Sequence, residues 1–304
     1  MKYWVGVTDN SWYQFLSGHV FDEVNFWQPS GTPPFTHLEA GTPFLFKLKR
    51  PYNHVAGFGY FVKYTKLPIT MAWEVFAEKN GASSFSEFEK LIQPLVGGVK
   101  TSLLEIGCSI LSAPQFFPRE AWIEAPPDWS GNIVRGKTYD TTQQVGNELW
   151  LAVQDRVSEV EPPQFEVREP ESRYGEAYLT RARLGQGTFR VLVTEAYQRR
   201  CAITGEHTLP VLDAAHIKPF AKQGPNSTQN GLLLRSDFHK LFDLGFVTVT
   251  PDLRVEVSPR IREEWFNGKA YYRLHGEALA ATPDKPSDRP SAEYLRWHNE
   301  NVYV

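Results

Sequence analysis

Two stretches of sequence decide the fold of the C-terminal part: LDAAHIKPF at 212–220 and NGLLLRSDFHKLFDLG at 230–245. The first is an apolar run that ends at a histidine, and the second opens with Asn-Gly, a turn signal, before three leucines. Residues 236–244 have helical spacing, with Ser236 expected as the N-cap and Gly245 placed where a helix ends. Together they predict two strands joined by a loop and followed by a short helix.

Four side chains in this unit have complementary chemistry. His216 ends the first strand, and a neutral histidine can accept a proton at neutral pH. Asn230 can hydrogen-bond backbone across the loop or orient His216. His239 and Asp243 stand at i and i+4, so they share one helix face, and a hard divalent ion accepts such a nitrogen and oxygen pair. Open coordination positions would remain for phosphate and water, which favours metal-assisted phosphodiester hydrolysis.

Each of these residues also has an ordinary structural explanation. A lone histidine in an apolar strand is usually a core residue, Asn-Gly is usually only a turn, and a His–Asp pair at helical spacing is often a surface pair. Their joint occurrence, in this order and at this spacing, favours the catalytic interpretation.

The strings CAITG at 201–205, LDAAHIKPF and NGLLLRSDFHKLFDLG resemble the HNH nucleases of the ββα-metal class over roughly residues 183–260. The similarity is to the subgroup with A-A-H-I-x-P and N-G-L-L-L-x-x-x-x-H-x-L-F-D. It implies that His216 is the general base and Asn230 the orienting residue. It also implies that His239 and Asp243 bind one divalent ion, Mg²⁺ or Mn²⁺, in each active site.

The sequence departs from the family pattern in two places. Many relatives carry a further metal ligand just before the base, where this chain has Ala215; Asp213, Asp237 or water could fill that role. Relatives with a structural zinc carry paired CxxC motifs, whereas this segment has Cys201 alone, so no structural zinc is expected.

The N-terminal half contains short β-like stretches at 3–7, 43–48 and 55–62, and helical spacing at 71–78 and 84–95. This mixture predicts a small β-barrel decorated by helices. The whole chain is therefore expected to be α+β, with this barrel followed by the ββα-metal nuclease fold.

Basic and aromatic residues alternate in this half, as a nucleic-acid surface requires. The residues expected to contact DNA are Lys47, Lys49, Arg135 and Lys137, together with Lys218 and Arg235 beside the nuclease motif. The residues expected to sandwich an extruded base and read its edge are Asn25, Trp27, Tyr64 and Trp129. Against this, aromatic residues in a small barrel are mostly core, and edge lysines often only prevent strand pairing.

The pattern G-x-P-x-L-F-K-L-K at 41–49, followed by V-A-G-F-G-Y-F at 55–61, resembles the PUA superfamily, whose EVE, ASCH and SRA-type domains bind modified bases. An HNH domain joined to such a reader resembles the modification-dependent restriction endonucleases of bacteria. That resemblance predicts a reader at 1–155, a linker at 156–180 and an HNH domain at 181–304.

Composition sets limits on these expectations. The 304 residues suffice for about two domains, and a net charge of −3 gives no whole-protein argument for nucleic acid, so any such argument rests on local patches. Two cysteines exclude a disulfide framework and agree with a reducing cytoplasm. The start is not typical of a signal peptide, and no apolar run would span a bilayer. We therefore expect a bacterial cytoplasmic protein without a membrane partner.

The primary hypothesis is an endonuclease that recognises 5-methyl- or 5-hydroxymethylcytosine in double-stranded DNA by base flipping and leaves 5′-phosphate ends. One alternative keeps the nuclease but has it read phosphorothioate or unmodified DNA. Another is a non-catalytic DNA-binding protein with a decayed HNH site. This alternative is retained because Ala215 stands where many relatives carry a metal ligand. Because a double-strand cut needs two active sites, a homodimer is also considered.

Overall fold

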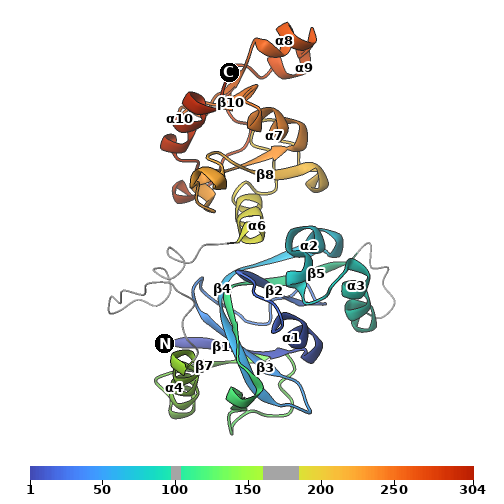
Figure 1. Cartoon of the computed structure of the whole chain (residues 1–304), viewed down its shortest axis with the longest axis vertical. Coiled ribbons are helices and arrows are strands. Elements are labelled where there is room, and N and C mark those ends of the chain that lie inside the picture. The colour runs from blue at the N-terminus through green and yellow to red at the C-terminus, as the bar shows by residue number, and fades with distance from the viewer. Residues whose placement is uncertain (97–103, 160–184) are drawn as a thin grey trace. The chain divides into compact units, whose positions relative to one another are not determined.

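The computed structural model describes residues 1–96, 104–159 and 185–304 (Figure 1). The chain divides into two compact units, Met1–Arg183 and Leu184–Val304. Helix α4 (Gln144–Glu159) runs into the expected linker, and the rest of that linker lies outside the described residues. The domain limits inferred from the sequence therefore stay predictions.

A seven-stranded sheet forms the N-terminal unit. Its strands follow the order β2-β5-β4-β3-β1-β7, with the short β6 added beside β4. Strands β1 and β3 pair in parallel, and the other pairs are antiparallel. The bounds are β1 Lys2–Thr8, β2 Glu23–Gln28, β3 Pro43–Leu48, β4 His54–Pro68, β5 Glu105–Phe116, β6 Ile123–Glu124 and β7 Gly136–Asp140.

The expected α+β class is confirmed, but the expected barrel is not closed. Among the described strands, no pairing joins the two edge strands β2 and β7. The 15-residue strand β4 bends through two register shifts against β5, between Phe58 and Tyr60 and between Phe61 and Lys63. Such bulges curve a sheet strongly. The result is a curved sheet with an open side between its edges.

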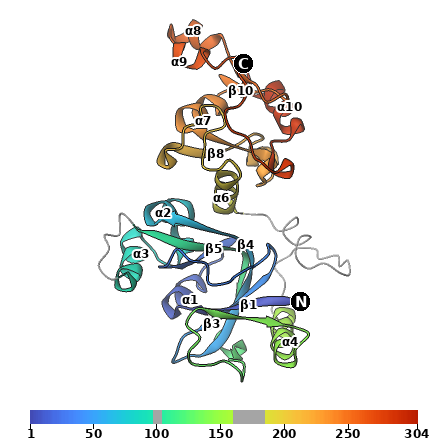
Figure 2. The ribbon, with the colours of Figure 1, turned by 180° about the vertical axis from the view of Figure 1, so that it is seen from behind.

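Each face of this sheet has its own core. One face packs Trp12 of α1 (Asn10–Leu16) against a group of phenylalanines that includes Phe26 and Phe46. The other packs Tyr3 and Tyr139 with residues of α4, which lies beside β1 and β7 (Figure 2). Helices α2 (Ile69–Phe76) and α3 (Phe85–Ile92) agree with the predicted helical stretches, whereas α1 and α4 were not predicted. None of the helices in the described ranges is long and apolar enough to cross a membrane.

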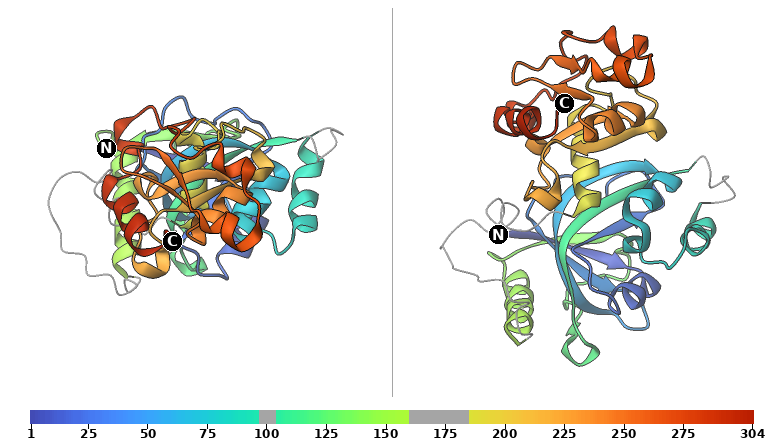
Figure 3. Two further views of the ribbon diagram at one scale, coloured as in Figure 1. Left: turned by 90° about the horizontal axis from the view of Figure 1, so that it is seen from above. Right: turned by 45° about the horizontal axis from the view of Figure 1, so that its top comes forward.

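The C-terminal unit contains the predicted strand–loop–strand–helix succession. Helix α6 (Gln186–Ala196) precedes β8 (Leu212–His216), β9 (Gly231–Arg235) and α7 (Ser236–Asp243). An antiparallel hairpin follows, formed by β10 (Val247–Val249) and β11 (Val255–Val257). Then come α8 (Arg260–Trp265), α9 (Lys269–Tyr272) and α10 (Ala292–Asn301), the last of these red in Figure 3.

The two ends of α7 differ in how well the sequence predicts them. Gly245 ends the helix as expected, with a φ of 78°, a conformation that favours glycine. The expected N-cap is wrong by one residue: Arg235 holds that position, and the hydroxyl of Ser236 instead donates to the carbonyl oxygen of Val211 at 3.1 Å. A contact between segments distant in sequence thus displaces the local capping preference.

His298 joins the C-terminal helix α10 to the helix of the nuclease motif. It is 2% exposed and stacks on Phe242 of α7, with ring centroids 3.7 Å apart. Its Nε2 donates to the carbonyl of Phe242 at 3.1 Å, and its Nδ1 accepts from the hydroxyl of Thr248 at 2.8 Å. This pairing requires a neutral ring, and burial lowers the pKa of His298 to about 4.

The pKa of His298 predicts how the stability of this unit depends on pH. The unfolded chain takes up the proton near pH 6.5, whereas the folded chain resists it until about pH 4. Stability therefore falls as the pH drops through that window, by at most about 3 kcal/mol from this group. Denaturant titrations of the wild type and His298→Gln at pH 7 and pH 5 should give a stability difference that shrinks by about 2 kcal/mol at pH 5. An equal difference at both pH values would contradict the assignment.

Candidate active site

Strands β8 and β9 hold the site on an antiparallel ladder in which Leu212 faces Arg235 and His216 faces Gly231. The loop between them closes where the amide of Ile217 donates to the carbonyl of Asn230 at 2.9 Å. Gly231 allows α6 to pack closely, since a Cβ there would lie 2.4 Å from a side-chain atom of Val193. The ladder therefore ends with His216 at a defined place beside α6.

The side chain of Asn230 holds the loop together and does not hydrogen-bond to His216. Its side chain is fully buried; Oδ1 accepts from the amide of Lys218, and Nδ2 donates to the carbonyls of Lys218 and Pro225, each at 2.9 Å. Of the two roles considered for Asn230, the structure shows the hydrogen bonding to backbone across the loop. Gly224 permits this crossing, because a Cβ there would lie 1.8 Å from the carbonyl oxygen of Lys218.

The residue that contacts His216 is Asn226, which sequence reasoning missed. The Nε2 of His216 lies 2.8 Å from Oδ1 of Asn226, so Nε2–H donates and the neutral ring keeps its lone pair on Nδ1. The ring of His216 stacks on Phe189 of α6, with centroids 3.8 Å apart and an interplanar angle of 12°. These two contacts hold the imidazole in one plane and favour one tautomer.

Burial lowers the pKa of His216 below its ordinary value, and the neighbouring His239 acts in the same direction. The hydrogen bond that Nε2 of His216 donates to Asn226 and the charge of Asp243 oppose this shift. The side chain is therefore neutral at neutral pH, the state that a general base requires.

His239 of α7 lies between two carboxylates. Its Nε2 is 3.3 Å from Oδ2 of Asp243, and its Nδ1 is 3.7 Å from Oδ2 of Asp213 on β8. All three side chains are partly exposed. Burial raises the pKa of Asp243, while His239 and His216 lower it. The structure thus brings together the two predicted metal ligands and adds Asp213.

The chemistry of this donor set fits a hard divalent ion, which binds carboxylate oxygen and imidazole nitrogen and retains water. The described residues contain no group of three or more His, Cys, Asp or Glu side chains that could hold a metal as they stand. This agrees with the two carboxylates lying at opposite ring nitrogens of His239. Ala215, at the family's usual ligand position, is fully buried in the core.

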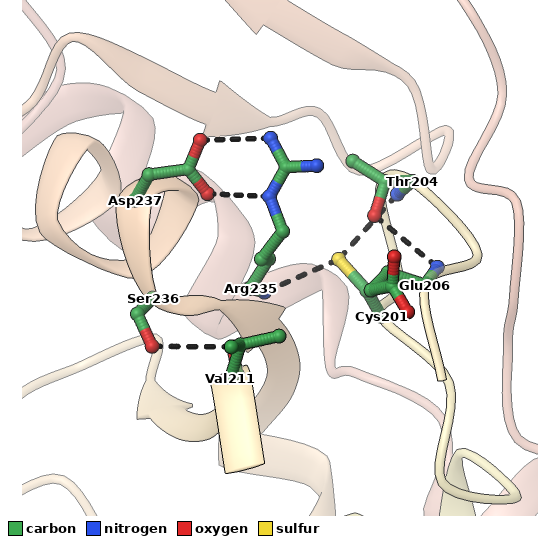
Figure 4. A network of polar contacts seen from close by, with 7 residues as sticks. All are labelled: Cys201, Thr204, Glu206, Val211, Arg235, Ser236 and Asp237. Carbon is green, nitrogen blue, oxygen red and sulfur yellow. Dashed lines mark hydrogen bonds and ion pairs between the residues drawn. The ribbon is translucent and has the colours of Figure 1, made fainter. Parts of the chain in front are cut away.

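Asp237, the other acid considered as a ligand, is already paired. Arg235 binds it through two contacts, Nε to Oδ1 at 2.7 Å and Nη2 to Oδ2 at 2.8 Å (Figure 4). The same figure shows the buried Cys201, whose sulfur accepts from the amides of Thr204 and Arg235. The charge of Arg235 is thereby balanced within the protein, which weakens the expectation that it contacts DNA.

The cations expected to contact DNA differ in their availability. Lys47 is 5% exposed, donates to Oδ1 of Asn53 at 2.6 Å and lies over the ring of Trp129, so its amine is engaged within the protein and its contact with DNA stays a prediction. Lys49 pairs with Asp9 at 2.9 Å and Lys137 with Asp128 at 2.5 Å. Arg135 and Lys218 form no ion pair with any described residue; Arg135 is exposed, and Lys218 lies over the ring of Trp297.

The four residues expected to form a base pocket do not meet. Asn25 is buried on the helix-covered face, where its amide donates to Asn80 and to the sulfur of Cys108. Trp27 donates to the carbonyl of Asn80 at 2.9 Å, and Trp129 packs in the core beside α4. Tyr64 packs against Phe35, with ring centroids 6.1 Å apart. Strand alternation separates them, since neighbouring residues on a strand point to opposite faces.

Comparison with known proteins adds the following. Residues 201–250 match the family described as HNH endonuclease. An ASCH structure from Zymomonas mobilis is similar at 10% identity and a TM-score of 0.34, covering 49% of this chain and 94% of that one. The modification-dependent TagI restriction endonuclease is similar at 15% identity and a TM-score of 0.29, covering 98% of this chain and 81% of that one. No curated protein matches the chain in sequence. The C-terminal unit therefore contains an HNH endonuclease domain, at residues 201–250.

Proposed function

We propose that the protein is a DNA endonuclease that cuts only where the DNA carries a modified cytosine, 5-methylcytosine or 5-hydroxymethylcytosine. The observation that supports the nuclease most directly is the neutral, positioned His216 near His239 and its two carboxylates, within the segment that matches the HNH family. The substrate is double-stranded DNA, and each chain supplies one active site.

In this mechanism Nδ1 of His216 accepts the proton of a water molecule as its oxygen attacks phosphorus. The bond from phosphorus to the 3′ oxygen breaks, the leaving oxygen takes up a proton, and the ends are 5′-phosphate and 3′-hydroxyl. Asn226 and Phe189 keep the imidazole oriented during the transfer. His239 with Asp213 or Asp243 would hold a divalent ion, Mg²⁺ or Mn²⁺, which supplies Lewis-acid stabilisation of the developing charge.

The need for a reader follows from what this site can contact. A base, a metal ion and nearby cations touch the DNA backbone and carry no information on sequence. Such a nuclease needs restraint from elsewhere in the chain, and the aromatic N-terminal unit has the composition for it. Extrusion of a base costs a few kcal/mol, which stacking at about 1–3 kcal/mol per base can offset.

A digestion panel tests this function. One plasmid is prepared with cytosine, 5-methylcytosine or 5-hydroxymethylcytosine and incubated with Mg²⁺ or Mn²⁺ at matched salt. We expect cleavage of the modified plasmids only. His216→Ala should reduce that cleavage by about 10² to 10⁴ with the fold intact, because the general base is lost. Equal cutting of all three plasmids would leave a nuclease without a reader, and no cutting under any condition would favour a DNA-binding protein with an inactive site.

The role of Asn226 is tested by the pH profile of cleavage. Activity requires neutral His216, so the rate should rise with pH and level off above its lowered pKa. Asn226→Asp places a carboxylate at Nε2, stabilises the imidazolium and should move the acid limb upward by about 1 pH unit or more. Asn226→Ala should lower the plateau without that upward movement. If Asn226 had only a structural role, both substitutions would lower the cleavage rate equally and the acid limb of the pH profile would not move.

The ligand assignment is tested by a matched pair of variants. Asp213→Asn should raise the Mn²⁺ concentration needed for half-maximal cleavage by about 10-fold or more, because the carboxylate beside His239 is lost. Asp237→Asn, which changes the paired acid next to Arg235, should leave that concentration unchanged. The assignment fails if the two variants respond alike.

A further inference from the structure

Five buried side-chain polar atoms in the described part of the chain have no hydrogen-bond partner, and all five belong to the N-terminal unit. Three of them are the indole nitrogen of Trp4, the hydroxyl of Tyr64 and the hydroxyl of Ser109. Trp4 is 5% exposed and Ser109 is fully buried. Leaving such groups unpaired costs about 1–3 kcal/mol each, so native proteins rarely keep them without a use.

These three groups belong to one region. Tyr64 on β4 stands directly across from Ser109 on β5. The ring of Phe35, from the segment between β2 and β3, contacts both other aromatic rings, with centroids 5.7 Å from Trp4 and 6.1 Å from Tyr64. The hydroxyl of Tyr64 and the carbonyl of Ser30 both lie against Gly107, where a Cβ would clash with them.

We propose that this region, bounded by Trp4, Phe35, Tyr64 and Ser109, is where the reader receives the extruded cytosine. The proposal rests on the function proposed above and names its recognition site. An indole N–H donates only, whereas the two hydroxyls can donate or accept. Together they can match the edge of cytosine, which presents two acceptors and one amino donor.

The route of entry is also indicated by burial. The three polar atoms are closed to solvent, and the ring of Phe35 packs against Trp4 and Tyr64. In this proposal a base enters when the segment that carries Phe35 moves aside. This segment, residues 29–42, contains no helix or strand. Its end is tied to β4, because the amide of Gly41 donates to the carbonyl of Phe61 at 2.7 Å and the amide of Phe61 donates to the carbonyl of Thr42 at 2.9 Å. The movement that the proposal requires is therefore that of the part before Gly41. The aromatic rings beneath it remain available for stacking.

This region has an exposed cation, Arg135, that is available to contact the DNA backbone. Arg135 is exposed; burial raises the pKa of the Tyr64 phenol, and the positive charge of Arg135 opposes that rise. The adjoining Gly136 packs against the indole of Trp4, because a Cβ there would lie 2.5 Å from it. Arg135 can therefore contact the phosphate of a nucleotide whose base lies at Trp4 and Tyr64.

Another aromatic cavity of this unit, of about 360 Å³, is less suited to reading a base. It is lined by Tyr13, Arg119 and Trp122 among others. The hydroxyl of Tyr13 donates to the carbonyl of Phe117 at 2.6 Å and accepts from Nε1 of Trp122 at 3.1 Å. Its buried polar atoms are thus already engaged, unlike those of Trp4, Tyr64 and Ser109.

The test uses the full chain carrying His216→Ala, so that binding is measured without cutting. Fluorescence anisotropy compares a duplex containing one 5-methylcytosine with the same unmodified duplex. Tyr64→Phe and Ser109→Ala should each weaken binding of the modified duplex by about 5- to 10-fold and leave the unmodified duplex unchanged, because one hydrogen bond is lost. Arg135→Ala should weaken both.

Thermal unfolding distinguishes a reading role from a structural one. Removal of a hydroxyl that has no partner in the free protein should leave the Tm unchanged or raise it. The matched controls are Tyr52→Phe, whose hydroxyl accepts from Gln14, and Ser112→Ala on the same strand as Ser109. Neither control should alter the preference for the modified duplex.

The outcomes separate this site from the function it serves. If the parent prefers modified DNA and Tyr64→Phe and Ser109→Ala both keep that preference, the site is wrong and the proposed function stands. If those variants lower the Tm and lose affinity for both duplexes equally, the residues are structural and the site is also wrong. A parent that binds both duplexes equally overturns the site and the proposed function together.

Discussion

The active site depends on the buried amide of Asn230, which ties both ends of the loop between β8 and β9. Three hydrogen bonds to Lys218 and Pro225 satisfy backbone groups that the loop would otherwise bury unpaired, at about 1–3 kcal/mol each. Only with the loop held in this path does Asn226 come within 2.8 Å of His216. The position of the general base is therefore a consequence of loop closure, and Asn230 acts on the chemistry through Asn226.

The sequence predicts this domain well where local rules apply, and less well where a contact joins distant segments. Apolar runs, the Asn-Gly signal and the i, i+4 pair His239–Asp243 are local, and the structure reproduces them. The choice between Asp213 and Asp237 was open because it depends on how α7 packs on β8. In the structure Asp237 is paired with Arg235, and Asp213 lies beside His239. Asn226 lies in an irregular loop, where no spacing rule distinguishes it from other polar residues.

The N-terminal unit was less predictable because its aromatic residues fill both faces of one sheet. Composition shows that rings and cations are abundant, but the parity of each strand decides which face a residue joins. Asn25 and Trp27 hydrogen-bond to Asn80, whereas Tyr64 packs against Phe35. Lys47 lies within a six-residue strand that is buried throughout, with its amine bound by Asn53. A basic residue in an aromatic stretch therefore does not by itself indicate a nucleic-acid surface.

The two units differ in how completely their buried polar groups are paired. In the C-terminal unit His298, Asn230 and Cys201 all have partners, and none of the buried side-chain atoms left without one in the described residues belongs to this unit. All of them lie in the N-terminal unit; two belong to Trp4 and Tyr64, which contact Phe35, and a third belongs to Ser109, which stands across from Tyr64. A catalytic site must be rigid before substrate arrives, so its hydrogen bonds are complete in the free protein. A site that discriminates between bases gains selectivity when its polar groups find partners only in the correct ligand, because a wrong ligand leaves them buried and unpaired. The unpaired groups lower the stability of the free reader. In return they would let the reader discriminate between bases, and that discrimination is what would restrain the nuclease.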